Sequence, residues 1–180
     1  ELGPVGFMPE DPVHVSDAFA ENGLEMIGGV VFRAFHDPAQ WDDVLDGSKR
    51  TCEALVAHGA QHLVLIDSIS PRRAPTAGRA LEAKQMDGAE WAAYVTRFRE
   101  ICKMGVDHGL TVGIHAHAAG FMDFEPELER LLGEIPEDLL QICFDTGHHS
   151  YAGFDPIAFM KKWISRISYL HFKDIDPKVK

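Results

Sequence analysis

The amino-acid sequence predicts an α/β fold in which parallel strands form part of a barrel. Short apolar segments typical of strands alternate with longer amphipathic segments typical of helices, which favours a parallel sheet covered by helices. Three of the apolar segments end at imidazole or carboxylate side chains, at His115, Asp145 and His171. Because parallel strands end together at one mouth of a barrel, we expect these side chains to converge there around a single metal ion.

The expected elements follow one another in a regular order. Strand-like segments occur near Glu1 and at residues 24–32, 62–67, 110–117, 140–145 and 167–172. Helical periodicity covers residues 41–58, 91–108, 127–134 and 156–166. Helix starts are marked by an aspartate cap followed by proline, at Asp11-Pro12, Asp37-Pro38 and Asp155-Pro156. One composition runs throughout, so residues 1–180 are expected to form a single domain. The irregular stretch 68–86 is long enough to be a functional loop.

Alternation along the strands predicts which side chains point into the barrel. Successive side chains of a strand point to opposite faces, and in a parallel barrel the apolar set packs against the helices. The other set then points inward, and it includes polar groups at the strand ends. These inward-facing polar residues are His115, His117, Asp145, His171 and Lys173.

Composition and charge restrict the class of partner. With 46% hydrophobic residues, a chain of 180 residues can bury a sizeable core. The net charge of −11 repels nucleic acid and anionic membranes, so we expect neither as a partner. No apolar run approaches about 18 residues, no basic-then-apolar leader is present, and the three cysteines form no CxxC pair. We therefore expect a cytoplasmic protein that binds a small molecule and that can form a homo-oligomer.

The ligand types predict the chemistry. Imidazole nitrogen and carboxylate oxygen suit one borderline or hard divalent ion, namely Mn²⁺, Co²⁺, Mg²⁺ or Zn²⁺. A cation at the mouth polarises a carbonyl or hydroxyl group of a bound polyol and acidifies the neighbouring carbon. A nearby histidine or lysine then moves the proton. Isomerisation, epimerisation and β-elimination of water share this first step, so the residues alone leave all three reactions open.

Six segments, in order along the chain, carry a resemblance to a known family. They are Glu-Leu-Gly-Pro-Val-Gly-Phe-Met-Pro at residues 1–9, Arg-Ala-Pro-Thr-Ala-Gly-Arg at 73–79, His-Ala-His at 115–117, Asp-Thr-Gly-His at 145–148, Tyr-Ala-Gly-Phe-Asp-Pro at 151–156 and His-Phe-Lys-Asp at 171–174. On these segments the chain resembles the sugar phosphate isomerase/epimerase superfamily, whose members are xylose isomerase-like (β/α)8 TIM barrels. It is most similar to the myo-inosose-2 dehydratase branch.

The resemblance implies a particular set of metal ligands. Asp145 and His171 would bind one divalent ion, and His115 stands where many relatives have glutamate, although His117 can take its place. His148 would contact the substrate or a ligand. Relatives also usually supply a glutamate from the last strand. Six strands are counted where a closed barrel of this type needs eight, so we expect the first and last strands, and one ligand, to be missing from this chain.

The predicted function is that of a metal-dependent lyase or isomerase acting on a small polyhydroxylated ketone, with inosose dehydration as the leading reaction. His117, His148 and Lys173 are the candidates for proton transfer. Arg73, Asp67 and Glu1 are the candidates for substrate contact. One alternative is a ketose epimerase or isomerase with the same metal site, and another is a non-catalytic barrel that binds sugars or a partner.

Several of these residues also have a purely structural alternative. Asp145 can cap the helix that follows it, and His171 can be a core histidine. Asp67 can be a turn residue, Arg73 can lie in a solvated loop, and Lys173 can pair with a carboxylate.

Overall fold

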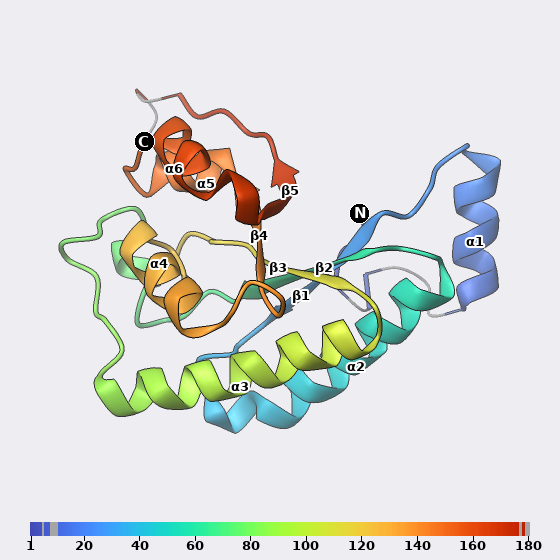
Figure 1. Cartoon of the computed structure of the whole chain (residues 1–180), viewed down its shortest axis with the longest axis horizontal. Helices are drawn as coiled ribbons and strands as arrows, with labels where there is room; N and C mark the ends of the chain where they lie inside the picture. The colour runs from blue at the N-terminus through green and yellow to red at the C-terminus, as the bar shows by residue number, and fades with distance from the viewer. Residues whose placement is uncertain (5, 8–10, 177, 179–180) are drawn as a thin grey trace.

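Five parallel strands form a single sheet in a computed structural model that describes residues 1–4, 6–7, 11–176 and 178. The strands are β1 (Gly28–Arg33), β2 (His62–Asp67), β3 (Thr111–Ile114), β4 (Gln141–Asp145) and β5 (Ile167–His171). They pair in the order β1-β2-β3-β4-β5, so neighbours in sequence are neighbours in space (Figure 1). The predicted α/β fold with a parallel sheet is confirmed. Within the described part of the chain the sheet is an open arc rather than a closed barrel.

The strand expected near Glu1 is the main error in the predicted elements. That region makes one isolated parallel bridge, between Leu2 and Gly29, so the sheet has five strands instead of six. Val5, Met8 and Pro9 of the first motif lie outside the described residues. Strand β3 ends at Ile114 rather than at residue 117, because the chain turns away into the loop that precedes the next helix.

Three helical segments begin where an aspartate and a proline predict. The helices are α1 (Pro12–Glu21), α2 (Trp41–Ala57), α3 (Gly88–Asp107), α4 (Glu125–Glu134), α5 (Thr146–Tyr151) and α6 (Pro156–Trp163), with 3₁₀ turns at Pro38–Gln40, Ala74–Thr76 and Ile164–Arg166. The three segments are α1, the 3₁₀ turn that leads into α2, and α6. The side chains of Asp11, Asp37 and Asp155 each accept a hydrogen bond from the first turn that follows. Helix α5 was expected only in the structural alternative for Asp145, in which that residue caps a following helix. No helix in the described ranges has the length and apolar character needed to span a membrane.

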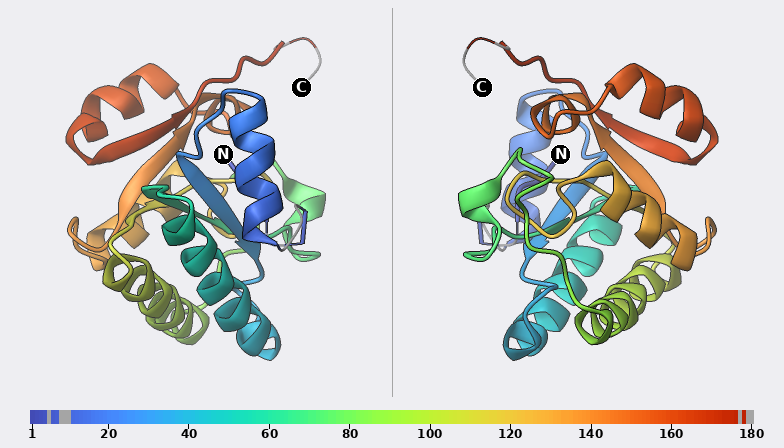
Figure 2. Two further views of the ribbon diagram at one scale, coloured as in Figure 1. Left: turned by 90° about the vertical axis from the view of Figure 1, so that its right-hand side faces the viewer. Right: turned by 90° about the vertical axis from the view of Figure 1, so that its left-hand side faces the viewer.

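The two faces of the sheet are packed differently. Helices α2 and α3 lie side by side under the outer face (Figure 2), where Val112, Ile114 and many larger apolar residues form the main core. The inner face carries a small second cluster. Its members are Val30, Val64, Ile66 and Cys143, with Phe32 and Tyr169 packed against them. This division confirms the alternation predicted for β3 and β4. On β5, Tyr169 lies on the inner face as predicted, but Leu170 and Phe172 are 36% and 75% exposed instead of packing against helices.

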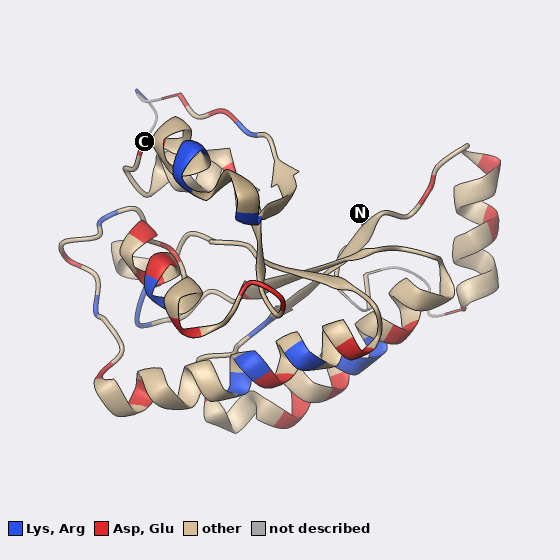
Figure 3. Cartoon of the chain, viewed as in Figure 1, with Lys and Arg blue, Asp and Glu red and all other residues tan. Residues whose placement is uncertain are grey.

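Charged residues are almost excluded from the strands and gather on the helices and loops (Figure 3). The strands contain three Lys, Arg, Asp or Glu residues, and each is the last residue of its strand: Arg33, Asp67 and Asp145. All three therefore lie at the carboxyl-terminal edge of the sheet, where a parallel barrel holds its active site.

One irregularity sets the register of β5. Its Cα partners are Ile142 with Ile167, Cys143 with Tyr169 and Asp145 with His171. Ser168 is therefore an extra residue on β5, which makes a β-bulge. Because side chains alternate, the extra residue turns Tyr169 and His171 toward the inner face and brings His171 level with Asp145.

Candidate active site

Asp145 is the centre of a polar cluster at the carboxyl-terminal ends of β3, β4 and β5. It ends β4 and caps α5, with its Oδ1 accepting a hydrogen bond from the backbone N–H of His148 at 2.8 Å. Its Oδ2 lies 3.1 Å from His115 Nε2, 3.6 Å from His171 Nδ1 and 2.5 Å from Lys173 Nζ. The side chains that the sequence predicted to converge are thus in contact, and Asp145 also has the capping role that was its structural alternative.

The surroundings of Asp145 keep it ionised. Burial by itself would raise the pKa of this carboxyl group. The hydrogen bonds from His115, His171 and Lys173 outweigh that effect and hold the pKa far below its usual range. The carboxylate is therefore a buried anion surrounded by nitrogen donors, and a metal cation would compete with these donors for it.

His115 is buried beside this anion, and one of its ring nitrogens is available to accept a hydrogen bond or bind an ion. A carboxylate only accepts, so His115 Nε2 carries the proton and Nδ1 has a lone pair. That Nδ1 has no hydrogen-bond partner among the described residues. Burial lowers the pKa of His115, which favours the neutral ring.

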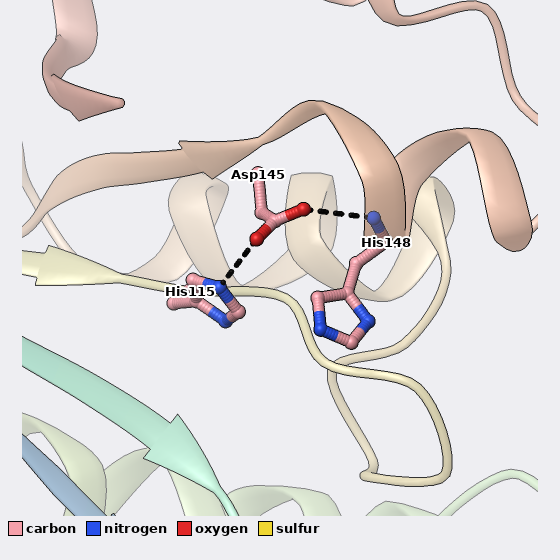
Figure 4. A group of neighbouring side chains, drawn as sticks. All are labelled: His115, Asp145 and His148. Carbon is pink, nitrogen blue, oxygen red and sulfur yellow. Dashed lines mark hydrogen bonds and ion pairs between the residues drawn. The ribbon is translucent and has the colours of Figure 1, made fainter. Parts of the chain in front are cut away.

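Three residues offer ligand atoms close enough together to bind one ion. His115, Asp145 and His148 each present one such atom, all within 4.8 Å of one another (Figure 4). Two imidazoles and one carboxylate are a donor set that suits a divalent ion, and the unpartnered Nδ1 of His115 is a free acceptor. The residues present therefore fit a divalent metal.

His171 lies in the same cluster but is held by acids on both sides. Its Nε2 is 2.8 Å from Glu1 Oε2 and 3.8 Å from Cys143 Sγ, while its Nδ1 faces Asp145. Hydrogen bonds with Asp145, Cys143 and Glu1 raise the pKa of His171 to about 11. The ring is thus cationic, and it would have to release a proton before it could bind a metal. The predicted ligand role of His171 stays a prediction.

His117 and His148 lie against each other at the edge of the cluster. Their ring centroids are 4.2 Å apart. His117 Nδ1 donates to the carbonyl oxygen of Ala118 at 2.9 Å, and the backbone N–H of Ala118 donates to His148 Nδ1 at 3.2 Å. Burial lowers the pKa of His148 to about 4, and the neighbouring His117 adds to this effect. Lys173, the third candidate for proton transfer, forms the carboxylate pair that the sequence left open as its alternative.

Asp67 and Arg73, two of the three predicted substrate contacts, lie outside the cluster. Asp67 accepts hydrogen bonds from the backbone N–H and Nδ1 of His36 and from the backbone N–H of Phe121, so it ties three loops together. Arg73 is 1% exposed, which rules out the solvated loop proposed as its alternative. Its guanidinium binds the Glu127 carboxylate at 2.6 and 3.1 Å. Their roles in substrate binding stay predictions that this placement does not support, whereas Glu1 does reach the cluster.

Sequence reasoning missed two features of this region. Ala118 bridges two histidines through its backbone alone, and an alanine side chain gives no signal of that. The Arg73–Glu127 pair joins residues far apart in the chain, and neither residue lies in a pattern that points to the other.

Comparisons with known proteins found matches in both sequence and fold. A family model described as "Xylose isomerase-like TIM barrel" matches residues 5–180. The inosose dehydratase of Geobacillus kaustophilus (strain HTA426) is 23% identical over 171 residues, which are 92% of this chain and 54% of that protein. The chain thus spans about half the length of this curated relative.

Solved structures share the fold at low sequence identity. The IolI protein with a bound zinc atom has a TM-score of 0.76 and 12% identity, covering 98% of this chain and 63% of that one. The 3-keto-D-glucoside 4-epimerase YcjR from E. coli has a TM-score of 0.72 and 16% identity, covering 91% of this chain and 64% of that one. Both likenesses show the architecture alone.

Proposed function

Because the chain belongs to the xylose isomerase-like TIM barrel family, we propose that it is a metal-dependent lyase or isomerase acting on a small polyhydroxylated ketone. The observation that carries the proposal is the Asp145 carboxylate, which lies within 3.6 Å of nitrogen atoms of His115, His171 and Lys173 at the carboxyl-terminal edge of the sheet. Dehydration of an inosose is the leading reaction, supported by relatives that carry the name inosose dehydratase.

The residues that would hold the metal are Asp145 and His115, joined by His171 once it has lost a proton. A bound divalent ion would polarise the substrate ketone and acidify the adjacent C–H bond. The IolI structure is described as having a bound zinc atom, which supports a divalent ion in a protein of this fold.

The chain's own groups would handle the proton. Dehydration needs a base at the α-carbon and a donor near the oxygen atoms of the substrate. The imidazoles of His117 and His148 stand together at the edge of the cluster and supply both kinds of group. Lys173 is paired with Asp145, so it would contribute positive charge to the site and would not act as a free amine base.

Spectroscopy of the reaction tests this proposal. The protein is treated with a chelator, supplied with Mn²⁺ or Co²⁺ and incubated with myo-inosose-2 while the ultraviolet absorbance of an unsaturated diketone is followed. We expect Asp145→Asn to lower the rate at least about tenfold, because asparagine still caps α5 but lacks the charge that binds the ion. The matched control is Asp155→Asn, which alters the equivalent cap of α6 and should leave the rate unchanged.

The other reactions have distinct outcomes. A changed stereocentre without the absorbance band would support an epimerase, the activity named for the E. coli structure. If neither Mn²⁺ nor Co²⁺ bound or raised the melting temperature, the proposal of a metal-dependent enzyme would be wrong and a binding barrel would be favoured.

A further inference from the structure

The two backbone groups of Ala118 determine where His117 and His148 carry their protons. An amide N–H can only donate, so the Nδ1 of His148 that accepts from it must hold a lone pair. A carbonyl oxygen can only accept, so the Nδ1 of His117 that bonds to it must carry a proton. A neutral imidazole has one N–H. Neutral His148 is therefore protonated at Nε2, and neutral His117 has its lone pair at Nε2.

We propose that Ala118 fixes opposite tautomers in these two rings, so that His117 is the base of the site and His148 its neutral hydrogen-bond donor. The assignment of roles rests on the proposed function, whereas the assignment of tautomers rests on the backbone contacts alone. Ala118 acts here as a positioning residue, and it does so through peptide groups that a change of its side chain would leave in place.

The turn that presents Ala118 is strained and tightly held. Ala119 has φ = 70°, a left-handed conformation that is unfavourable for an alanine. Its carbonyl oxygen accepts from Ser70 N–H at 3.0 Å, and its N–H donates to Asp123 Oδ2 at 3.0 Å. A Cβ on Gly120 would lie 2.8 Å from the backbone oxygen of Asp67. Neighbouring elements thus hold a conformation that this alanine would not adopt by itself.

Asp67 gains a role in this arrangement. Its Oδ2 accepts from Phe121 N–H at 3.0 Å, which anchors the far side of the same turn. The predicted site residue Asp67 thus supports the loop that carries His115, His117 and Ala118, and its influence on the chemistry would be exerted through that loop.

The opposite tautomers suit a dehydration with one base. His117 Nε2 takes the α-proton, the C–H electron pair forms the carbon–carbon double bond of the enolate, and the carbonyl oxygen takes the negative charge. His148 Nε2–H donates a hydrogen bond to that oxygen and keeps its proton. The enolate electrons then re-form the carbonyl, the double bond moves to the α and β carbons, and the β C–O bond breaks. The departing hydroxyl takes the proton back from His117 and leaves as water.

The same contacts limit the metal ligands. While His148 Nδ1 accepts from Ala118 and its Nε2 carries the proton, neither nitrogen offers a lone pair to an ion. Of the three residues whose ligand atoms lie together, His115 and Asp145 remain, with the nearby His171 as the next nitrogen.

Nuclear magnetic resonance of the metal-free protein tests the tautomers directly. Long-range ¹H–¹⁵N spectra of ¹⁵N-histidine-labelled protein distinguish protonated from unprotonated ring nitrogens, and the His117→Gln and His148→Gln variants assign the two rings. We expect the Nε2–H form for neutral His148 and the Nδ1–H form for neutral His117. The same tautomer in both rings, or the reverse pair, would overturn the proposal.

A glycine variant tests the dependence on the turn. Gly120→Ala brings a Cβ against the backbone of Asp67, so it should displace the turn and produce a mixture of tautomers in both rings. The matched control is Gly133→Ala on α4, where nothing lies within 4 Å of the added atom and both tautomers should persist. Unchanged tautomers in a folded Gly120→Ala protein would show that Ala118 does not set them. If that variant does not fold, the spectra of the unmodified chain decide alone.

Turnover of myo-inosose-2 separates the two roles. Glutamine cannot take a proton, so His117→Gln should lower kcat by on the order of 10²–10⁴-fold. A glutamine amide can still donate, so His148→Gln should retain much more activity than His148→Ala. Equal losses in the two glutamine variants would overturn the roles. A chain with the expected tautomers and no turnover at all would overturn the proposed function instead.

Discussion

The two faces of the sheet are made from the same strands but have different contents. The outer face joins one large core with helices α2 and α3, and Leu63, Leu65 and Ile114 on it are fully buried. The inner face has a small apolar cluster that leads to the polar groups at the strand ends. Adjacent residues of a strand face opposite ways, so one residue packs in the core while its neighbour faces the site. Substitutions on the outer face should change stability, and those at the inner mouth should change the site.

The largest loss of stability is expected at the buried Arg73–Glu127 pair, because both residues are charged and both are buried. Arg73→Met leaves the Glu127 carboxylate buried without its partner, so we expect a loss of about 3–5 kcal/mol in the free energy of unfolding, measured by urea denaturation. The neighbouring Arg72→Met breaks an exposed pair with Glu90 and should cost at most about 1 kcal/mol. Similar losses for the two variants would contradict the comparison.

A pair of adjacent strand residues tests the two faces directly. Leu65 points to the main core, and Ile66 points to the small inner cluster. Truncation to alanine removes a similar volume at each position and costs about 2–5 kcal/mol in general. We expect Leu65→Ala to lie near the upper end of that range and Ile66→Ala near the lower end, because fewer atoms surround the inner cavity. Urea denaturation of both variants measures the difference, and a larger loss for Ile66→Ala would reverse the conclusion.

His149 extends the comparison to neighbours on α5, because His148 belongs to the site while His149 is buried among aromatic rings. Those rings are Phe144, Phe154 and Phe159. Burial lowers the pKa of His149 to about 4 against the raising effects of Asp155 and Glu129, and Nε2 also lies 3.2 Å from Glu125.

The sign of the pH effect follows from that lowered pKa. The unfolded chain takes up this proton near pH 6.5, so the stability from the neutral ring is present above about 6.5 and is lost as the pH falls toward 4. When the pH is lowered from about 7 to about 5, we expect the free energy of unfolding to fall less for His149→Phe than for the unmodified protein. The exposed His14→Gln is the control, and parallel pH profiles for all three proteins would refute the assignment.

The smallest expected effect is on metal binding at the inner mouth of the sheet, and it concerns Lys173. Its ammonium group already neutralises Asp145 Oδ2, so Lys173→Met should tighten Mn²⁺ binding about two- to fivefold, as for removal of a partly exposed ion pair. Lys162→Met is the matched control, because Lys162 pairs with Glu129 at the same 2.5 Å on another part of the surface. Calorimetric titration measures both, and weaker Mn²⁺ binding by Lys173→Met would show that the lysine supports the metal.

Much of this fold was accessible from the sequence, for physical reasons that vary by element. Strand β2 was predicted with its observed bounds because an apolar run follows a glycine that ends a helix. Strand β1 begins four residues later than predicted, because the apolar Leu24 and Ile27 are exposed ahead of the sheet. The bounds of helix α5 were not predicted, because its six residues, Thr-Gly-His-His-Ser-Tyr, have little intrinsic preference for helix and depend on the Asp145 cap.

The site was predictable where side chains mark it and hidden where the backbone makes it. The convergence of Asp145, His115 and His171 follows from strand ends and alternation. The tautomers set by Ala118 depend on a turn held by Ser70 and Asp67, contacts that no local pattern contains. The pairing of Arg73 with Glu127 likewise depends on tertiary packing between a loop and α4.

The bulge at Ser168 determines which face of the sheet the later residues of β5 present. If β5 paired regularly from Ile167 onward, Ser168 would lie opposite Cys143 and every later residue of the strand would present the opposite side. His171 and Lys173 would then turn toward the helices, and Leu170 would lie beside Asp145. Loss of the bulge, with every histidine and acid retained, would therefore exchange polar for apolar side chains at the mouth of the site.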